Sequence, residues 1–146
     1  MSNNQFKRGE LYSVINGVAS TAVARRLQKN FRNAGLEITI EQWSILYHLW
    51  KEDGLSQQEL CTRTYRDKAS ITRLIDNIEK LGLVERIASK DDRRVNLVYL
   101  TDAAKPLQEA TYNLANQTMN EALQGISKEE IEIVKSVFQR VYENSK

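Results

Sequence analysis

The chain has 146 residues, with 21 Lys and Arg against 19 Asp and Glu, and hydrophobic residues make up 41% of it. This composition is typical of one soluble globular domain, and a chain of this length buries roughly two thirds of its surface without help from disulfides or metals. The opening residues lack the apolar core of a secretion signal, and no stretch approaches the roughly 18 apolar residues of a membrane span, so we expect a cytoplasmic protein.

Several kinds of catalytic or metal site lack the residues they would need. The six glycines are never spaced as in a loop that binds phosphate, which excludes the common nucleotide-binding motifs. One His and one Cys cannot supply the ligands of a tetrahedral zinc site. His48 lies in the apolar segment WSILYHLW and Cys61 lies beside Leu60, so we expect both to be packed or surface residues. We therefore predict a protein that is not an enzyme and needs no metal or cofactor.

The first half of the chain has the hydrophobic spacing of helices. Between residues 10 and 34, apolar side chains recur every three or four positions and predict one long amphipathic helix that ends at a left-handed Gly35. Two pairs at capping-box spacing each start a further helix: Thr39 with Gln42, and Ser56 with Glu59. The segment TYRDKAS then leads into a fourth helix, which Asp67 is placed to cap. The apolar face of this helix is formed by Ile71, Leu74, Ile75, Ile78 and Leu81.

After Gly82 the hydrophobic period changes from 3.6 residues to about 2. LVERIA and VNLVYL have the alternating, β-branched character of short strands, and the six polar residues SKDDRR between them predict an antiparallel hairpin with a charged tip. Thr101 and Ser127 are predicted to cap two final amphipathic helices. Pro106 is expected to remove one backbone hydrogen bond near the start of the first of these and to bend it.

This order of elements predicts a mostly α-helical fold with a small β-hairpin wing, the winged helix-turn-helix. Residues 1–146 are expected to form a single domain, with the winged helix-turn-helix lobe at about 37–101. The helices at about 8–35 and 102–145 carry apolar stripes that a monomer would leave exposed. They therefore predict N- and C-terminal dimerisation helices and a two-fold homodimer.

The exposed face of the fourth helix is the candidate DNA-reading surface. Arg73 is able to contact guanine in the major groove, while the hydroxyls of Ser70 and Thr72 reach base edges or phosphates, and Lys68 offsets the charge of Asp67 at the helix N-terminus. The net charge of residues 63–94 is +3, from nine Lys and Arg against six Asp and Glu, which suits contact with phosphates. An ordinary solvated helix face explains the same residues.

The tip of the predicted hairpin is the second candidate DNA-binding element. Arg93 and Arg94 project from a short loop with no core to pack on, and Arg is commonly inserted into narrow minor grooves. Asp92 would repel phosphate unless it pairs with an Arg and fixes its direction, so we predict that it braces the wing. The alternative is a loop that only adds solubility.

With these residues, the chain closely resembles the multiple-antibiotic-resistance regulator (MarR) family of bacterial transcription factors. The resemblance is carried by SITRLIDNIEKLGLVER followed by KDDRRVNLVYLT, and it extends over nearly the whole chain. Its most specific parts are the Ser-x-Thr-Arg pattern, here Ser70, Thr72 and Arg73, and the Asp-x-Arg to Leu-Thr pattern of the wing. The latter is formed here by Asp92, Arg94, Leu100 and Thr101.

The resemblance implies a homodimer in which the first, fifth and sixth helices intertwine. It also implies a cytoplasmic repressor, less often an activator, whose affinity for double-stranded DNA is changed by a small, often aromatic, ligand or by thiol oxidation. Members that sense peroxide carry a reactive cysteine near the start of the first helix, and this chain has none there. A thiol-sensing role for Cys61 is therefore not expected.

The aromatic residues and the overall function each allow two interpretations. Trp43, Tyr47 and Tyr12 are candidate aromatic walls of a ligand pocket between the dimerisation helices and the lobe, although aromatic residues at helical spacing also fit a packed core. The function predicted here is a sequence-specific regulator, most simply a repressor, bound to a palindromic operator as a homodimer. The alternative is a dimeric winged-helix protein-interaction module with weak, non-specific DNA binding, which would bind all duplex sequences alike.

Overall fold

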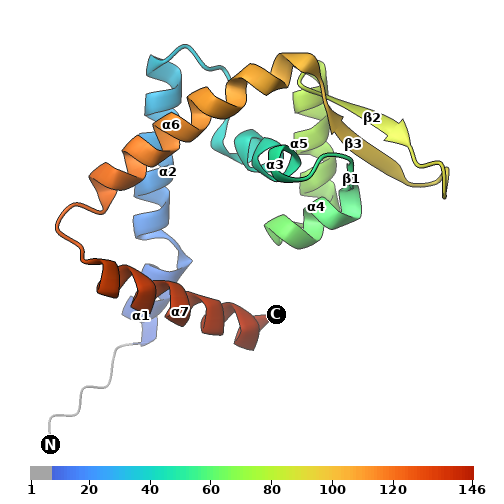
Figure 1. Cartoon of the computed structure of the whole chain (residues 1–146). Coiled ribbons are helices and arrows are strands. Elements are labelled where there is room, and N and C mark those ends of the chain that lie inside the picture. The colour runs from blue at the N-terminus through green and yellow to red at the C-terminus, as the bar shows by residue number, and fades with distance from the viewer. Residues whose placement is uncertain (1–7) are drawn as a thin grey trace, which may run out of the picture.

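The computed structural model describes residues 8–146 and confirms a mostly helical fold with a small antiparallel sheet (Figure 1). The first seven residues of the predicted domain lie outside the described residues. No helix within residues 8–146 is long and apolar enough to cross a membrane. The elements are α1 (Arg8–Asn16), α2 (Val18–Asn33), α3 (Ile40–Lys51), β1 (Leu55–Ser56), α4 (Gln57–Thr64), α5 (Lys68–Lys80), β2 (Val84–Ala88), β3 (Asn96–Leu100), the 3₁₀ helix η1 (Asp102–Ala104), α6 (Lys105–Ala122) and α7 (Lys128–Ser145).

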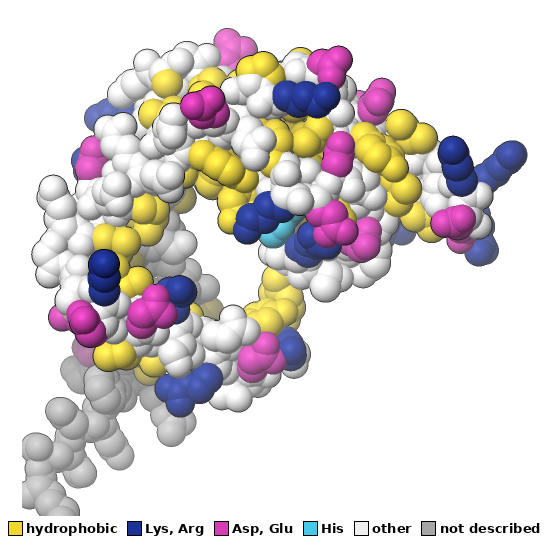
Figure 2. Space-filling model, in the orientation of Figure 1, with side chains coloured by type: hydrophobic (Ala, Val, Ile, Leu, Met, Phe, Trp, Pro, Cys, Tyr) yellow, Lys and Arg dark blue, Asp and Glu magenta, His cyan; other side chains and the backbone are white. Residues whose placement is uncertain are grey.

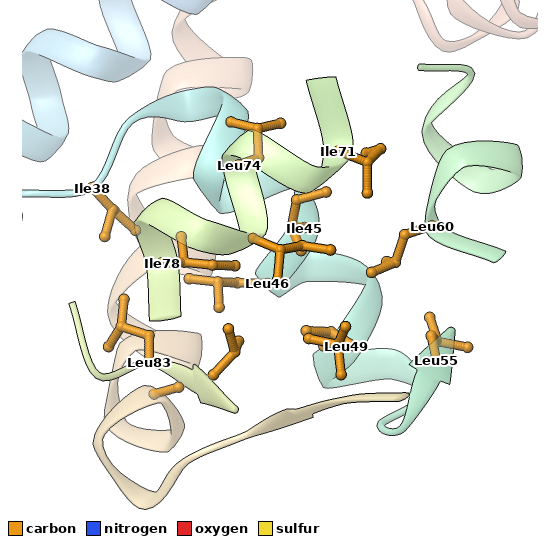
Figure 3. Close-up of a cluster of buried hydrophobic side chains, with 14 of the residues drawn as sticks. Ile38, Ile45, Leu46, Leu49, Leu55, Leu60, Ile71, Leu74, Ile78 and Leu83 are labelled. Atoms are coloured by element: carbon orange, nitrogen blue, oxygen red, sulfur yellow. The ribbon is translucent and has the colours of Figure 1, made fainter. Parts of the chain in front are cut away.

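Most of the core lies in the lobe formed by α3, α4, α5 and the sheet (Figure 3), and Leu27 and Phe31 of α2 belong to the same buried cluster. The predicted apolar face of α5 is confirmed: Ile71, Ile75 and Ile78 are fully buried, and Leu74 is 9% exposed. Leu81 is the exception, because it is the C-cap residue and is exposed. The α5 face packs against α3 and α4, whose fully or almost fully buried side chains are Ile45, Leu46, Leu49 and Leu60. Burial of one face leaves the opposite face of α5 directed at solvent.

The predicted hairpin is confirmed as β2 and β3, which pair antiparallel from Val84 opposite Leu100 to Ala88 opposite Asn96. The sheet also has a third strand, β1, that the hydrophobic pattern did not predict, and the strand order is β1-β3-β2. β1 has only two residues, so it shows no alternation, but Leu55 is buried opposite Val98. It fastens the start of α4 to the base of the wing.

Three capping boxes position the helices as predicted, with both reciprocal hydrogen bonds present in each: Thr39 with Gln42, Ser56 with Glu59, and Ser127 with Glu130. The predicted cap at Thr101 is wrong, because its hydroxyl donates to the Gly82 carbonyl at 2.6 Å. A 3₁₀ turn follows, and α6 begins only at Lys105. Pro106 therefore lies in the first turn of α6, where an N–H has no intrahelical partner, and the predicted loss of a helical hydrogen bond does not occur.

The predicted long helix over residues 10–34 is also wrong, because it is divided into α1 and α2 at Gly17. Gly17 is buried and has a φ of 125°, a conformation that L side chains rarely adopt. The apolar period continues across the break, so periodicity alone gave no sign of it. Gly35, with a φ of 78°, ends α2 in the left-handed conformation that was predicted.

The helices at the two chain ends form arms outside the lobe (Figure 1). α6 crosses α2, where Asn30 donates to the Thr118 hydroxyl at 2.8 Å and Arg26 forms an ion pair with Glu121. α7 has no buried residue, and an opening separates most of it from the lobe (Figure 2). Its end approaches the lobe where the Tyr142 and Tyr65 rings meet at 5.7 Å between centroids. The arms thus leave large apolar side chains exposed, among them Leu11, Val14, Val134, Val137 and Phe138.

The turn before β1 provides a test of the lobe. Gly54 has a φ of 71°, and a Cβ added there would lie 2.8 Å from Cε1 of Tyr99. We expect Gly54→Ala to lower the free energy of unfolding by roughly 1 to 2 kcal/mol from the left-handed backbone alone, and further because the Tyr99 ring must move. Urea denaturation measures the loss.

Gly82→Ala is the matched control, since Gly82 has a φ of 75° and a Cβ added there would meet open space. Its loss should equal the backbone component only. Equal losses in the two variants would show that the Tyr99 contact carries no cost.

Candidate nucleic-acid interface

The turn between α4 and α5 sets the direction of the exposed α5 face. The C-cap residue of α4 is Tyr65, a non-glycine residue in the left-handed conformation with a φ of 52°. The next N–H, of Arg66, donates to the Cys61 carbonyl at 3.1 Å. Asp67 then caps α5 as predicted, because its carboxylate accepts the Ser70 N–H at 2.7 Å. This bond lowers the pKa of Asp67, so the cap is ionised at neutral pH. The α5 N-terminus is therefore held by a carboxylate beside Lys68.

The structure distributes the predicted α5 residues between two environments. Lys68 and Arg73 are exposed, as a reading surface requires. Ser70 and Thr72 are half-buried instead. The Thr72 hydroxyl accepts a hydrogen bond from Nε2 of Gln57 on α4 at 3.2 Å, so it is held in place by the protein.

The wing tip carries the remaining predicted residues. Arg93 is exposed, and the Arg94 side chain is 91% exposed. Oδ1 of Asp92 accepts from the Arg94 N–H and Nε at 3.1 Å each, and Oδ2 accepts from Nη2 at 3.2 Å. These bonds from Arg94 lower the pKa of Asp92. Basic side chains gather at the far end of the hairpin with acidic ones beside them (Figure 2).

The end of the wing loop, where β3 begins, and the start of α5 lie close together. Lys68 and Arg94 line one hollow, together with the N-terminal residues of α4. The hollow is completed by Ser56, Gln57, Gln58, Cys61, Val95 and Asn96. The structure therefore brings the two predicted DNA-binding elements onto one side of the lobe.

Arg86 is a site residue that the sequence pattern did not single out. Its side chain, on β2, is only 16% exposed and forms ion pairs with Asp76 at 2.6 Å and Glu79 at 3.1 Å, both on α5. Nε of Arg86 also donates to Oε1 of Gln57 at 2.9 Å. The period-2 pattern of LVERIA was the available signal, because it places Arg86 on the same strand face as buried Val84. Arg86 thus joins the wing to both helices of the helix-turn-helix.

The predicted aromatic residues do not all meet. Trp43 and Tyr47 are in contact, with ring centroids 5.7 Å apart, and Tyr112 of α6 lies 5.8 Å from Tyr47. The Nε1 atom of Trp43 is buried and has no hydrogen-bond partner among the described residues. Tyr12 is 67% exposed on α1 and lines a separate hollow with residues of α1 and α2. The cluster is therefore Trp43, Tyr47 and Tyr112, and only the first two were predicted.

The single cysteine and the single histidine lie in the lobe. Cys61 is unpaired and 9% exposed, which is the packed position expected of it. Burial, together with the charges of Arg63 and Lys51, lowers the pKa of His48, so it is neutral at pH 7.

Comparison with known proteins agrees with this geometry. The MarR family model matches residues 38–95, which hold the helix-turn-helix and most of the wing. A probable transcriptional regulator from Pseudomonas aeruginosa is 28% identical, with 94% of this chain and 97% of that chain covered and a TM-score of 0.74. A MarR transcriptional regulator from Methanosarcina mazei Go1 is 24% identical, with 94% of each chain covered and a TM-score of 0.75.

A third similar structure is a mutant of MarR from E. coli complexed with operator DNA. It is 23% identical to this chain, with 91% of each chain covered and a TM-score of 0.79. The lobe at residues 38–95 thus matches the MarR family model, and this chain shares its fold with these regulators over more than nine tenths of each chain.

Proposed function

We propose that the protein is a transcriptional regulator, acting as a repressor, that binds a palindromic DNA operator as a homodimer. The observation that carries the proposal is the placement of two exposed arginine-bearing elements, α5 and the wing tip, on one side of a rigid lobe. The similar E. coli protein in complex with operator DNA supports the same partner. In this proposal α5 enters the major groove and the wing tip enters the adjacent minor groove.

The two arginines are expected to make different contacts. Arg73 is exposed on α5 near the helix N-terminus, where a guanidinium is able to bond guanine O6 and N7 together. Arg94 is directed by Asp92 and suits the negative potential of a narrow minor groove. Lys68 and Arg93 supply phosphate contacts on either side.

We expect Arg73→Ala to cost about 1 to 3 kcal/mol of binding per half-site and to relax preference at one base position. Arg94→Ala should weaken binding most on sites with A·T-rich flanks, and Arg94→Lys should restore only part of the loss, because ammonium holds its water more strongly. Fluorescence anisotropy with a selected operator and random duplex measures both effects. If both alanine variants bind the operator like the parent, or if the parent binds all duplexes alike, the protein-interaction module is the better interpretation.

Replacing Asp92 distinguishes two roles of its carboxylate: a group that orients Arg94, or only a negative charge near the phosphates. Losing a negative charge near phosphate should tighten binding, whereas losing a group that directs Arg94 should weaken it. We expect Asp92→Ala to weaken binding. Asp91→Ala is the matched control on the same exposed turn, and we expect it to bind as tightly as the parent or more tightly. Tighter binding by Asp92→Ala would exclude the brace.

Dimerisation is proposed from the exposed apolar side chains of α1 and α7. A soluble monomer rarely exposes so many large apolar residues on two helices. A palindromic operator requires that the second copy covering these arms place its α5 one turn of DNA from the first, in a successive major groove.

We expect Phe138→Glu to shift the protein from dimer to monomer in sedimentation velocity, because it would bury a charge among apolar side chains. Ser136→Glu is the control, since helical geometry places it on the opposite face of α7. Deletion of residues 127–146 should dissociate or unfold the protein. A parent that sediments as a monomer at micromolar concentration while binding the operator tightly would contradict the homodimer.

The aromatic cluster is the proposed site of a small effector that releases the DNA. Trp43, Tyr47 and Tyr112 join α3 of the lobe to α6 of the arm, so a ligand there would act on their relative position. The free Nε1–H of Trp43 provides a donor for a phenolic or carboxylate oxygen.

We expect at least one member of a panel of phenols and benzoic acids to raise the thermal unfolding midpoint and to lower operator affinity. Trp43→Phe, which removes the donor, should abolish both responses. Tyr12→Ala should leave both unchanged, because Tyr12 lies apart from the cluster. A panel with no effect on either quantity would exclude a ligand of this class.

A further inference from the structure

Three side chains from three elements form one chain of hydrogen bonds that ends on the proposed DNA-reading face. Nε of Arg86, on β2, donates to Oε1 of Gln57 at 2.9 Å. Nε2 of Gln57, on α4, donates to Oγ1 of Thr72 on α5 at 3.2 Å. This series of hydrogen bonds begins at the largely buried Arg86 guanidinium and ends at the half-buried Thr72 side chain.

Arg86 determines which group donates and which accepts in each of these hydrogen bonds. A guanidinium has five donors and no acceptor, so only the oxygen of the Gln57 amide is able to face Arg86. Arg86 itself is held by the carboxylates of Asp76 and Glu79. The amide nitrogen of Gln57 must therefore face Thr72, and the orientation of an otherwise ambiguous amide is settled by chemistry.

The hydroxyl of Thr72 consequently accepts from the protein and keeps its own proton free. Thr62 and Thr64 on α4 differ, because their hydroxyls donate to the carbonyls of Gln58 and Leu60. Within residues 8–146 the Thr72 hydroxyl has no such acceptor. A hydroxyl that accepts one hydrogen bond is polarised toward donating another.

Resting on the proposed DNA-binding function, we infer that Gln57 and Arg86 are positioning residues that make Thr72 a hydrogen-bond donor toward DNA. Thr72 then selects a base edge that presents an acceptor in the major groove. These edges are guanine O6 and N7, adenine N7 and thymine O4, whereas the cytosine amino group offers only a donor. Specificity at that position is set by two residues that do not themselves need to touch DNA.

The test exchanges the donor at position 57 for an acceptor. In Gln57→Glu, the carboxylate accepts from Arg86 with one oxygen and takes the Thr72 proton with the other, so Thr72 presents only lone pairs to DNA. The relative affinities of all four bases are measured at each position of an operator selected with the parent. One hydrogen bond corresponds to a preference of about two- to tenfold.

We expect the parent to prefer acceptor edges at one position and Gln57→Glu to lose or reverse this preference there, in favour of the cytosine or adenine amino group. Gln58→Glu is the matched control, because Gln58 is exposed, lines the same hollow and gains the same charge. It should lose overall affinity similarly and keep the base preference. Thr72→Val should remove the preference at this position alone, and Thr72→Ser should keep it.

A measurement on the DNA keeps the inference falsifiable even if Gln57→Glu does not fold. Where the preferred base is a purine, its 7-deaza analogue lacks the N7 acceptor, and where it is guanine, 2-aminopurine lacks the O6 acceptor. Where it is thymine, the 4-thio analogue weakens the O4 acceptor, and the 2-thio analogue, changed in the minor groove, is the control. The parent should bind the operator that lacks the contacted acceptor as weakly as Thr72→Val does. A selective parent whose base profile is unchanged in Gln57→Glu and Thr72→Val overturns this inference alone. A parent without sequence preference overturns the proposed function and this inference together.

Discussion

The arrangement of the lobe depends on the contacts of the Arg86 guanidinium. It lies on the wing, and its partners lie on α4 and α5, so three elements share one charged group. The carboxylates of Asp76 and Glu79 are 49% and 42% exposed, so each pair contributes no more than about 1 kcal/mol to stability. Its larger effect is geometric, because a planar group with several fixed partners allows little rotation of the hairpin.

The Arg86 contacts fix how α5 and the wing, the two elements that carry exposed arginines, lie relative to each other. The apolar face of α5 holds the helix against α3 and α4, and Arg86 holds the hairpin to the same helix through Asp76 and Glu79. β1 adds a second attachment, since Leu55 and Ser56 pair with the start of β3. The wing is therefore attached to the helix-turn-helix at its base on both edges, while its tip stays in solvent.

Much of this lobe could be predicted because its signals are local. The α5 stripe, the capping boxes and the Asp67 cap each depend on residues within a few positions of one another. The Arg86 contacts and Tyr112 could not, since each joins residues that only the folded chain brings together. Gly17 was missed for another reason: hydrophobic spacing continues through it, and only its backbone conformation divides the helix.

The wrong prediction that Thr101 caps a helix shows that a tertiary hydrogen bond can compete with a local capping signal. A hydroxyl before a helical pattern predicts a cap, but the same hydroxyl meets the Gly82 carbonyl once the hairpin has closed. The tertiary bond prevails and α6 starts four residues later, with Pro106 in its first turn. The residues proposed to contact DNA were easier to name than their environments, and Thr72 is the example, because its exposure was predicted and its bond to Gln57 was not.

The exposure of α7 affects how readily the protein is degraded in the cell. An 18-residue helix without a buried side chain has little to hold it folded, since helices of this length are marginal in water by themselves. If the proposed homodimer forms, α7 of a chain without a second copy would fray into an unfolded tail, which is where proteases begin. Newly made chains at low concentration would then be degraded and associated ones spared, so that turnover itself sets a lower limit on the working amount of the regulator.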